Sequence, residues 1–185
     1  MEGLYKNKFR IKSARLDSWD YSSNGYYFIT ICIKNFRCLF GGIEDDEMVL
    51  NQLGEIAVAY WIEIPQHFNN VILDEFVVMP NHVHGIIIIK NKQSRDVAMQ
   101  RLYRGNYKNM SKISPQSNSL SVIIRSYKSI VVKTINQKFS HINFKWQSLF
   151  YDHIIRTEQS LYNIRNYIIS NPDKWADDGN NPKVL

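Results

Sequence analysis

Two apolar runs joined by a Pro–Asn pair constrain the fold of this chain more than any other feature. Residues 77–89 read VVMPNHVHGIIII, so Pro80 and Asn81 separate two segments rich in β-branched residues. Such segments favour strands, and proline and asparagine are typical turn residues, so the stretch predicts a β-hairpin. The second run begins with His82 and His84, although the rest of it has the composition of a buried strand.

The segments around this hairpin alternate between strand and helix patterns. The expected strands cover 25–34, 70–80, 82–90 and 148–156, and the expected helices cover 51–68, 119–139 and 157–172. Pro65 is expected to end the first helix and Thr157 to cap the last, while 38–51 is expected to form a Gly–Gly turn and an acidic connection. This order predicts one α+β domain over 1–185, with a ferredoxin-like antiparallel sheet flanked by helices and a core at 20–175.

Positive charge is concentrated in the middle of the chain. The net charge is +6, and residues 90–138 hold eleven lysines and arginines but one acidic residue, Asp96. A segment this one-sided favours a polyanion such as nucleic acid as partner, and a merely solvated surface is the alternative interpretation. Arg125, Lys128 and Lys133 lie off the apolar stripe of the helix at 119–139, so they are expected to contact phosphates. Residues 91–118 are a polar, basic insertion without periodicity, expected to order on a partner or to be disordered.

Cysteine usage and hydropathy bear on the compartment. The two cysteines, Cys32 and Cys38, define no disulfide framework, and the first twenty residues have no apolar segment of a secretory signal. No apolar run approaches the roughly 20 residues of a membrane helix. The expectation is a cytoplasmic protein without a membrane partner.

The two histidines form a candidate metal site. Residues i and i+2 of a strand project from one face, so His82 and His84 present two imidazoles that can chelate one divalent cation. A solvated pair without a role is the alternative. A structural zinc site would need four ligands, and neither cysteine has suitable spacing.

A second candidate lies near the end of the chain. Tyr167 and Asn171 are four residues apart in the expected last helix and share a face. A tyrosine hydroxyl beside a metal-bound phosphate is a possible nucleophile, and the Asn171 carbonyl a possible third ligand. Spacing alone does not select Tyr167 from the other ten tyrosines.

The histidine pair and the segment around Tyr167, taken together, resemble a known protein family. VVMPNHVHGIIII, followed downstream by WQSLFYDHIIRTEQSLYNIRNYIISNPDKW, resembles the single-tyrosine HUH transposases, in particular the REP-associated and IS200-like branches. The resemblance implies that His82, His84 and Asn171 bind Mg²⁺ or Mn²⁺ and that Tyr167 is the nucleophile. It implies cleavage and rejoining of single-stranded or hairpin DNA through a 5′-phosphotyrosine. It also places Arg156 in a family-typical stretch, where DNA contact is expected.

The resemblance further implies a bacterial, nucleoid-associated protein. It leaves open a monomer, which we expect, or a homodimer that exchanges the tyrosine helix. A domesticated, non-catalytic protein that binds hairpin or single-stranded DNA is the main alternative function. A two-histidine phosphoesterase is disfavoured because the chain has no H-x-[ST] motif, and a zinc hydrolase because no general-base carboxylate accompanies the pair.

Overall fold

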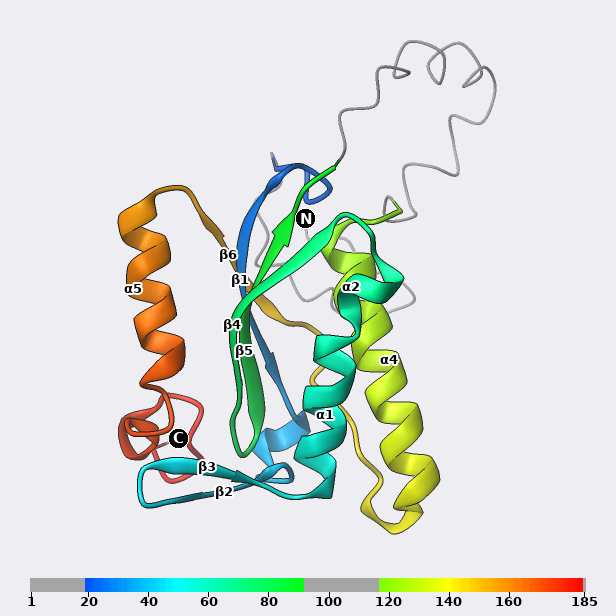
Figure 1. Cartoon of the computed structure of the whole chain (residues 1–185). Coiled ribbons are helices and arrows are strands. Elements are labelled where there is room, and N and C mark those ends of the chain that lie inside the picture. Colours follow the sequence, from blue (N-terminus) through cyan, green and yellow to red (C-terminus); the bar gives the residue numbers. More distant parts are fainter. Residues whose placement is uncertain (1–18, 92–116, 185) are drawn as a thin grey trace, which may run out of the picture.

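A four-stranded antiparallel sheet organises the chain, and the expected hairpin supplies one edge strand, β4, and one central strand, β5 (Figure 1). The computed structural model describes residues 19–91 and 117–184, so most of the basic insertion lies outside the described residues. The strand order is β4-β5-β1-β6. The strands are β1 (Gly25–Cys32), β4 (Val71–Val78), β5 (His82–Ile89) and β6 (Tyr151–Ile155).

Helices cover both faces of this sheet. Figure 1 shows α1 (Gln52–Ile62) and α4 (Leu120–Lys138) on one face and α5 (Glu158–Ile169) on the other. The short helices are α2 (Ile64–His67), η1 (Lys34–Phe36), η2 (Ser140–Ile142) and η3 (Trp175–Asp177). The Thr157 hydroxyl accepts a hydrogen bond from the backbone of Ser160, which confirms the predicted cap. The α+β prediction, an antiparallel sheet flanked by helices, is confirmed.

Two local predictions were wrong. Residues 38–51 hold a second hairpin, β2 (Gly41–Glu44) and β3 (Glu47–Leu50), instead of a loose connection. Its turn residues, Asp45 and Asp46, have positive φ, which aspartate tolerates and which tight hairpin turns require. Pro65 does not end a helix but stands in the first turn of α2, where a missing N–H costs nothing.

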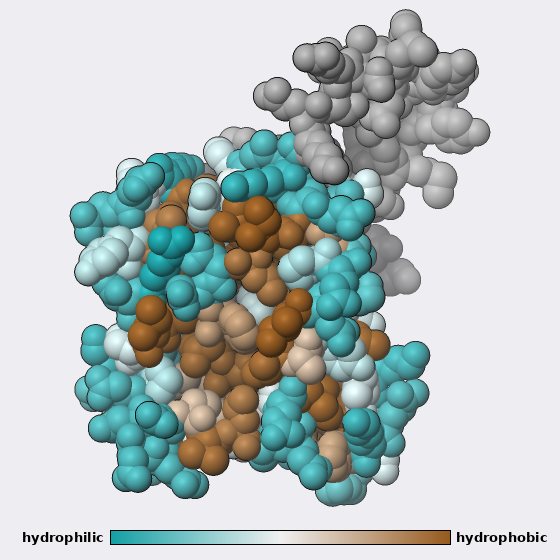
Figure 2. Space-filling model, viewed as in Figure 1, coloured by the Kyte–Doolittle hydropathy of each residue, from teal (hydrophilic) through white to brown (hydrophobic). Residues whose placement is uncertain are grey.

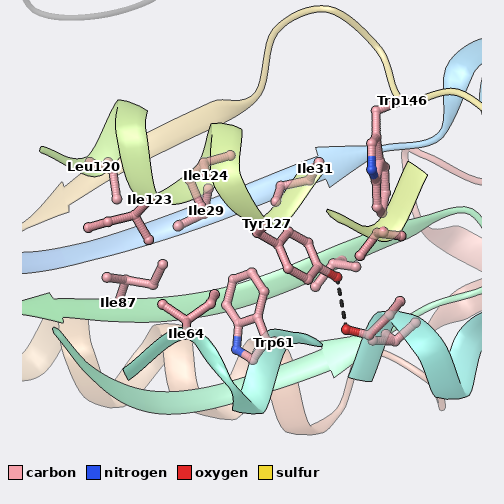
Figure 3. Close-up of a cluster of buried hydrophobic side chains, with 14 of the residues drawn as sticks. Ile29, Ile31, Trp61, Ile64, Ile87, Leu120, Ile123, Ile124, Tyr127 and Trp146 are labelled. Carbon is pink, nitrogen blue, oxygen red and sulfur yellow. Dashed lines mark hydrogen bonds between the residues drawn. The ribbon is translucent and has the colours of Figure 1, made fainter. Parts of the chain in front are cut away.

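The main hydrophobic core lies between the sheet and the pair α1 and α4 (Figure 3). Trp61 of α1 is fully buried and packs edge-to-face on Tyr127 of α4, with ring centroids 5.2 Å apart. The Tyr127 hydroxyl donates to the carbonyl of Ala57 over 3.1 Å, so the polar end of this ring is satisfied inside the core. These contacts fix α4 on α1 and hold both against the sheet.

Gly85 of β5 is expected to tolerate no side chain. A Cβ there would lie 2.3 Å from Cζ2 of the fully buried Trp61 ring. Gly85→Ala should therefore lower the free energy of unfolding by about 1–3 kcal/mol in urea titrations. Gly42→Ala is the matched control, because no heavy atom lies within 4 Å of its added Cβ. Equal stability of the two variants would contradict the packing described.

A smaller hydrophobic cluster lies under α5. It contains Phe28, Ile86, Ile88, Ile155 and Ile168, so β5 and β1 are covered on both faces. Val83, between the two histidines, points into the main core instead. The alternation of β5 therefore directs His82 and His84 toward α5.

An ion pair holds α5 against the outer strand β4. Nε and Nη2 of Arg165 donate to the two carboxylate oxygens of Asp74 over 2.8 and 2.6 Å. Asp74 lies where the β4–β5 register shifts, between Leu73 and Phe76.

Figure 2 shows apolar side chains gathered between α5 and α1, where β4 forms the sheet edge. Within the described residues, no helix has the length and hydropathy to cross a membrane.

Candidate metal and tyrosine site

His82 and His84 lie side by side at the start of β5, as the sequence predicted. Their ring centroids are 4.3 Å apart, and the two residues are 0% and 2% exposed. The predicted alternative, a solvated pair, does not fit this burial. The end of β1 lies alongside, with Cys32 opposite His82 and Thr30 opposite His84.

Asn81 fixes the protonation of His82. The Asn81 amide Nδ2 donates to the carbonyls of Phe36 and Asn180 over 3.1 and 2.7 Å, so its Oδ1 can only accept. That Oδ1 lies 2.8 Å from Nδ1 of His82, which must carry the proton. Nε2 of His82 then bears a lone pair, and it is buried without a hydrogen-bond partner among the described residues.

His84 joins the sheet to the tyrosine helix. Its Nδ1 lies 2.8 Å from the Thr30 hydroxyl, and its Nε2 lies 3.1 Å from the Tyr167 hydroxyl. The ring also stacks on Phe28, with centroids 5.3 Å apart. The structure thus brings Tyr167 to the histidine pair, although Tyr167 and His84 are 83 residues apart in sequence.

Asp178 completes the cluster, and the sequence reasoning missed it. One ligand atom each of His82, His84 and Asp178 lie within 4.8 Å of one another, and all three residues are buried. Asp178 follows η3 in the stretch DDGNNP, which has the composition of an ordinary turn. Nothing in that stretch distinguishes Asp178 from its exposed neighbour Asp177.

Asn171 lies beside this cluster but two residues beyond the end of α5. Its Nδ2 donates to Oδ2 of Asp178 over 3.0 Å, and its amide lowers the pKa of the Tyr167 phenol. The residue is 2% exposed, and its Oδ1 has no hydrogen-bond partner among the described residues. The predicted i, i+4 pair within one helix does not form, because α5 ends at Ile169 and Asn171 lies beyond its C-cap, Ser170.

Tyr167 is accessible from outside while its hydroxyl points inward. The residue is 42% exposed. Burial of the hydroxyl and the negative charge of Asp178 raise its pKa to about 12, while the hydrogen bond from Asn171 lowers it. The phenol is therefore protonated at neutral pH when only protein groups surround it.

Burial dominates the electrostatics of the cluster. It lowers the pKa of His82 to about 4, against the opposing charge of Asp178. Burial and the charge of His82 lower the pKa of His84 well below its usual value. Burial raises the pKa of the Asp178 carboxyl, but hydrogen bonds from Asn180 and Asn171 and the charge of His82 outweigh it, so that pKa is lowered. At neutral pH the cluster therefore holds two neutral imidazoles and one carboxylate.

In the presence of a chelator, the free energy of unfolding is expected to fall as the pH drops from about 6.5 toward about 4. In that window the histidines of the unfolded chain bind protons, whereas the buried histidines of the folded chain stay neutral. Their contribution to the free energy of unfolding is therefore complete above about pH 6.5 and is lost progressively as the pH falls below it. For His82 the lowered pKa corresponds to on the order of 3 kcal/mol. Urea titrations across this range should show a shallower pH dependence for His82→Gln. The exposed-site control His67→Gln should keep the wild-type dependence, and an unchanged slope in His82→Gln would contradict the assignment.

The donor set fits a divalent cation. Two neutral imidazoles and a carboxylate are ligands that Mn²⁺ and related cations accept. The partnerless Nε2 of His82 and Oδ1 of Asn171 are buried polar atoms of the kind that proteins usually satisfy, and a cation would satisfy both. The Nδ1–H bond to Asn81 is the type of second contact that orients a ligating histidine.

The predicted phosphate contacts fall in different places. Arg125 and Lys128 line one cavity beside α4, whereas Lys133 is exposed on α4 outside it. The Arg156 guanidinium lies over the ring of Trp19, 5.7 Å from its centroid. The basic side chains at 92–112 and in the first 18 residues lie outside the described residues.

Comparison with known proteins gives one close relative in sequence and one informative structure. An uncharacterized protein of Haemophilus influenzae (strain KW20 / Rd) is 41% identical over 170 residues, which cover 90% of this chain and 91% of that protein. No family model matches the sequence. The solved structure of a REP-associated tyrosine transposase bound to a REP hairpin aligns with a TM-score of 0.57 at 18% identity, covering 89% of this chain and 74% of that one. The chain thus belongs to the same family as the Haemophilus influenzae protein, and its fold is that of the REP-associated tyrosine transposase.

Proposed function

We propose that this protein is a metal-dependent transposase that cleaves and rejoins single-stranded DNA through a covalent bond to Tyr167. The observation that carries the proposal is the 3.1 Å approach of the Tyr167 hydroxyl to Nε2 of His84, at the edge of the buried His82, His84 and Asp178 cluster. A half-exposed tyrosine that points its hydroxyl into a metal-ligating cluster is suited to attack a bound phosphate.

The ligands proposed for Mg²⁺ or Mn²⁺ are Nε2 of His82, Nε2 of His84 and the Asp178 carboxylate, with Oδ1 of Asn171 as a further candidate. A cation held there supplies Lewis-acid stabilisation of the charge on a bound phosphate and lowers the pKa of a nearby hydroxyl. Asn81 and Thr30 orient the two imidazoles through their Nδ1 atoms. Asn171 holds the Asp178 carboxylate, and its amide lowers the pKa of the proposed nucleophile.

The reaction balances without an external energy source. The Tyr167 oxygen attacks the phosphorus of a phosphodiester, and the bond from phosphorus to the 3′ oxygen breaks. The proton lost by the phenol ends on that oxygen, which leaves as a 3′ hydroxyl. The new bond joins Tyr167 to a 5′ phosphate, and attack by another 3′ hydroxyl restores the tyrosine and a DNA phosphodiester. The raised pKa of Tyr167 keeps the phenol uncharged until cation and substrate are in place.

The proposed substrate is DNA with a hairpin. The REP-associated tyrosine transposase of the same fold was solved with a REP hairpin. The basic span 90–138 supplies the cations that a nucleic-acid backbone attracts. All the side chains of the proposed site come from one chain, so we propose that a monomer is competent, acting in the bacterial cytoplasm on nucleoid DNA.

Incubation with labelled DNA tests the function directly. The substrates are single-stranded hairpins from repeats that flank the gene, with Mn²⁺ or with chelator. The products are separated on a denaturing gel that retains protein–DNA adducts. The proposal predicts a metal-dependent adduct together with a released strand that ends in a 3′ hydroxyl. Tight metal-independent binding without any adduct would indicate the alternative, a domesticated DNA-binding protein.

A further inference from the structure

An open cavity of about 820 Å³ lies beside α4, away from the α5 face that carries the histidines. Its walls come from α4, from η1 and from the segment that leads into β6. Four cationic side chains line it, and none of its described lining residues is acidic; the four are Lys34, Arg125, Lys128 and Lys145. Its volume lies in the range of about 300–1,000 Å³ that is typical of sites for compact ligands.

The four cations have different roles. The Lys128 ammonium donates to the carbonyls of Gln147, Ser148 and Leu149 over 2.6, 3.3 and 3.3 Å. It therefore shapes the cavity wall rather than meeting a ligand. Lys34, Arg125 and Lys145 are exposed, so their charged ends can reach an incoming anion.

The wall formed by η1 carries the ring of Phe36, a residue whose backbone has an unfavourable conformation. Asn35 and Phe36 have φ values of 58° and 51°, in the left-handed region that a bulky residue such as phenylalanine rarely adopts. Asn81 holds this conformation, because its amide donates to the Phe36 carbonyl. The Phe36 ring is half-buried and lines the cavity.

The cavity and the candidate metal site share structural supports. Asn81 holds the Phe36 carbonyl with Nδ2 and orients His82 with Oδ1. Cys32 lies between the two places: burial raises the pKa of its thiol to about 11, the charge of Asp178 raises it further, and the charge of Lys128 lowers it. Both places therefore adjoin the end of β1, where Cys32 pairs with His82 and Lys34 begins the cavity wall.

We propose that this cavity binds unpaired nucleotides of the DNA strand, with phosphates on Lys34, Arg125 and Lys145 and a base against Phe36. A cavity of this size excludes a double helix but admits part of a single strand. A basic groove with an aromatic platform is the combination that proteins use for unpaired strands. The inference rests on the proposed function, since it supplies a second contact region for the same substrate.

Fluorescence anisotropy with a labelled oligothymidine of about 12 nucleotides tests the inference in chelator, where no cleavage takes place. Arg125→Glu and Lys145→Glu should each weaken binding about tenfold, and the neutral variants Arg125→Gln and Lys145→Gln should weaken it less. The slope of log affinity against log salt should fall by about 0.7 for each lost phosphate contact. The control is Lys183→Glu, which makes the same charge change at an exposed lysine outside the cavity and outside the basic span. Equal losses in Lys183→Glu and the cavity variants, or no loss at all, would overturn the inference.

Two further readouts separate this inference from the proposed function. A blunt DNA duplex of two strands, which has no unpaired nucleotides, should bind the cavity variants as tightly as it binds wild type, whereas a loss equal to that for oligothymidine would overturn the subsite. Oligothymidine with photoreactive 5-iodouracil should crosslink to the peptide that contains Phe36, and crosslinks confined to other peptides would contradict it. If cavity-dependent binding is found but no DNA gives an adduct, the subsite stands and the transposase proposal fails. If adducts form but the cavity variants bind oligothymidine normally, the subsite alone fails.

Discussion

Tyr167→Phe is expected to abolish covalent attachment of DNA and to lower the cleavage rate roughly 10³-fold or more, because no other group replaces a missing nucleophile. The substitution removes one hydroxyl and leaves the aromatic ring, which packs edge-to-face on Phe28 at 6.0 Å. Fold and DNA affinity should therefore stay close to wild type. The measurement is the yield of adduct at fixed time, with anisotropy in chelator as the check on binding.

Tyr162→Phe is the matched control for this prediction. Tyr162 lies on the same helix and is 62% exposed. Its substitution by phenylalanine removes the same hydroxyl group at a position away from His84. It should retain wild-type cleavage. An adduct that survives in Tyr167→Phe and disappears in Tyr162→Phe would move the nucleophile and contradict the proposed site.

Asp178→Ala is expected to weaken Mn²⁺ binding by about 100-fold or more, measured by calorimetry on the protein without DNA. Loss of a ligating carboxylate removes both a donor atom and the negative charge of the cluster, and this exceeds the 10–100-fold effect typical of groups behind the ligands. The adjacent Asp177→Ala, which removes an exposed carboxylate, should bind Mn²⁺ normally.

Asn171→Ala separates the two roles open to that residue in the same titration. If Asn171 only holds Asp178, Mn²⁺ affinity should fall by about 10–100-fold. A loss of Mn²⁺ affinity equal to that of Asp178→Ala would indicate that Oδ1 of Asn171 is itself a metal ligand. Normal Mn²⁺ affinity in Asp178→Ala would contradict the ligand set derived from the structure.

The parts of the fold governed by local pattern could be predicted from the sequence. The two-residue spacing of His82 and His84 sets their common direction once β5 is a strand, and Thr157 supplies a cap recognisable from its type. The second hairpin, β2 and β3, was not predicted from the sequence, because its strands are four residues each and its turn uses two aspartates instead of glycine. Pro65 suits both a helix end and a helix start, and only the chain after it decides between them.

The candidate site was less predictable, because long-range contacts build it. Asp178 and Asn81 are turn residues by sequence, and only the folded chain brings the carboxylate of one and the amide of the other to the histidines. By its position in the helix, Lys128 resembles an ordinary surface lysine. In the folded chain its ammonium instead donates hydrogen bonds to three backbone carbonyls at 147–149. Positive charge along a sequence thus indicated a partner class, but it did not identify the side chains free to meet that partner.

The most direct test of the central claim is identification of the amino acid that carries DNA in the adduct. The wild-type adduct, formed with Mn²⁺ and a hairpin substrate, would be digested with protease and nuclease and sequenced by mass spectrometry. The account predicts a nucleotide phosphate linked to the Tyr167 oxygen, in the peptide that follows Arg165. A phosphate on any other residue would contradict the claim that Tyr167, held beside His84, is the nucleophile.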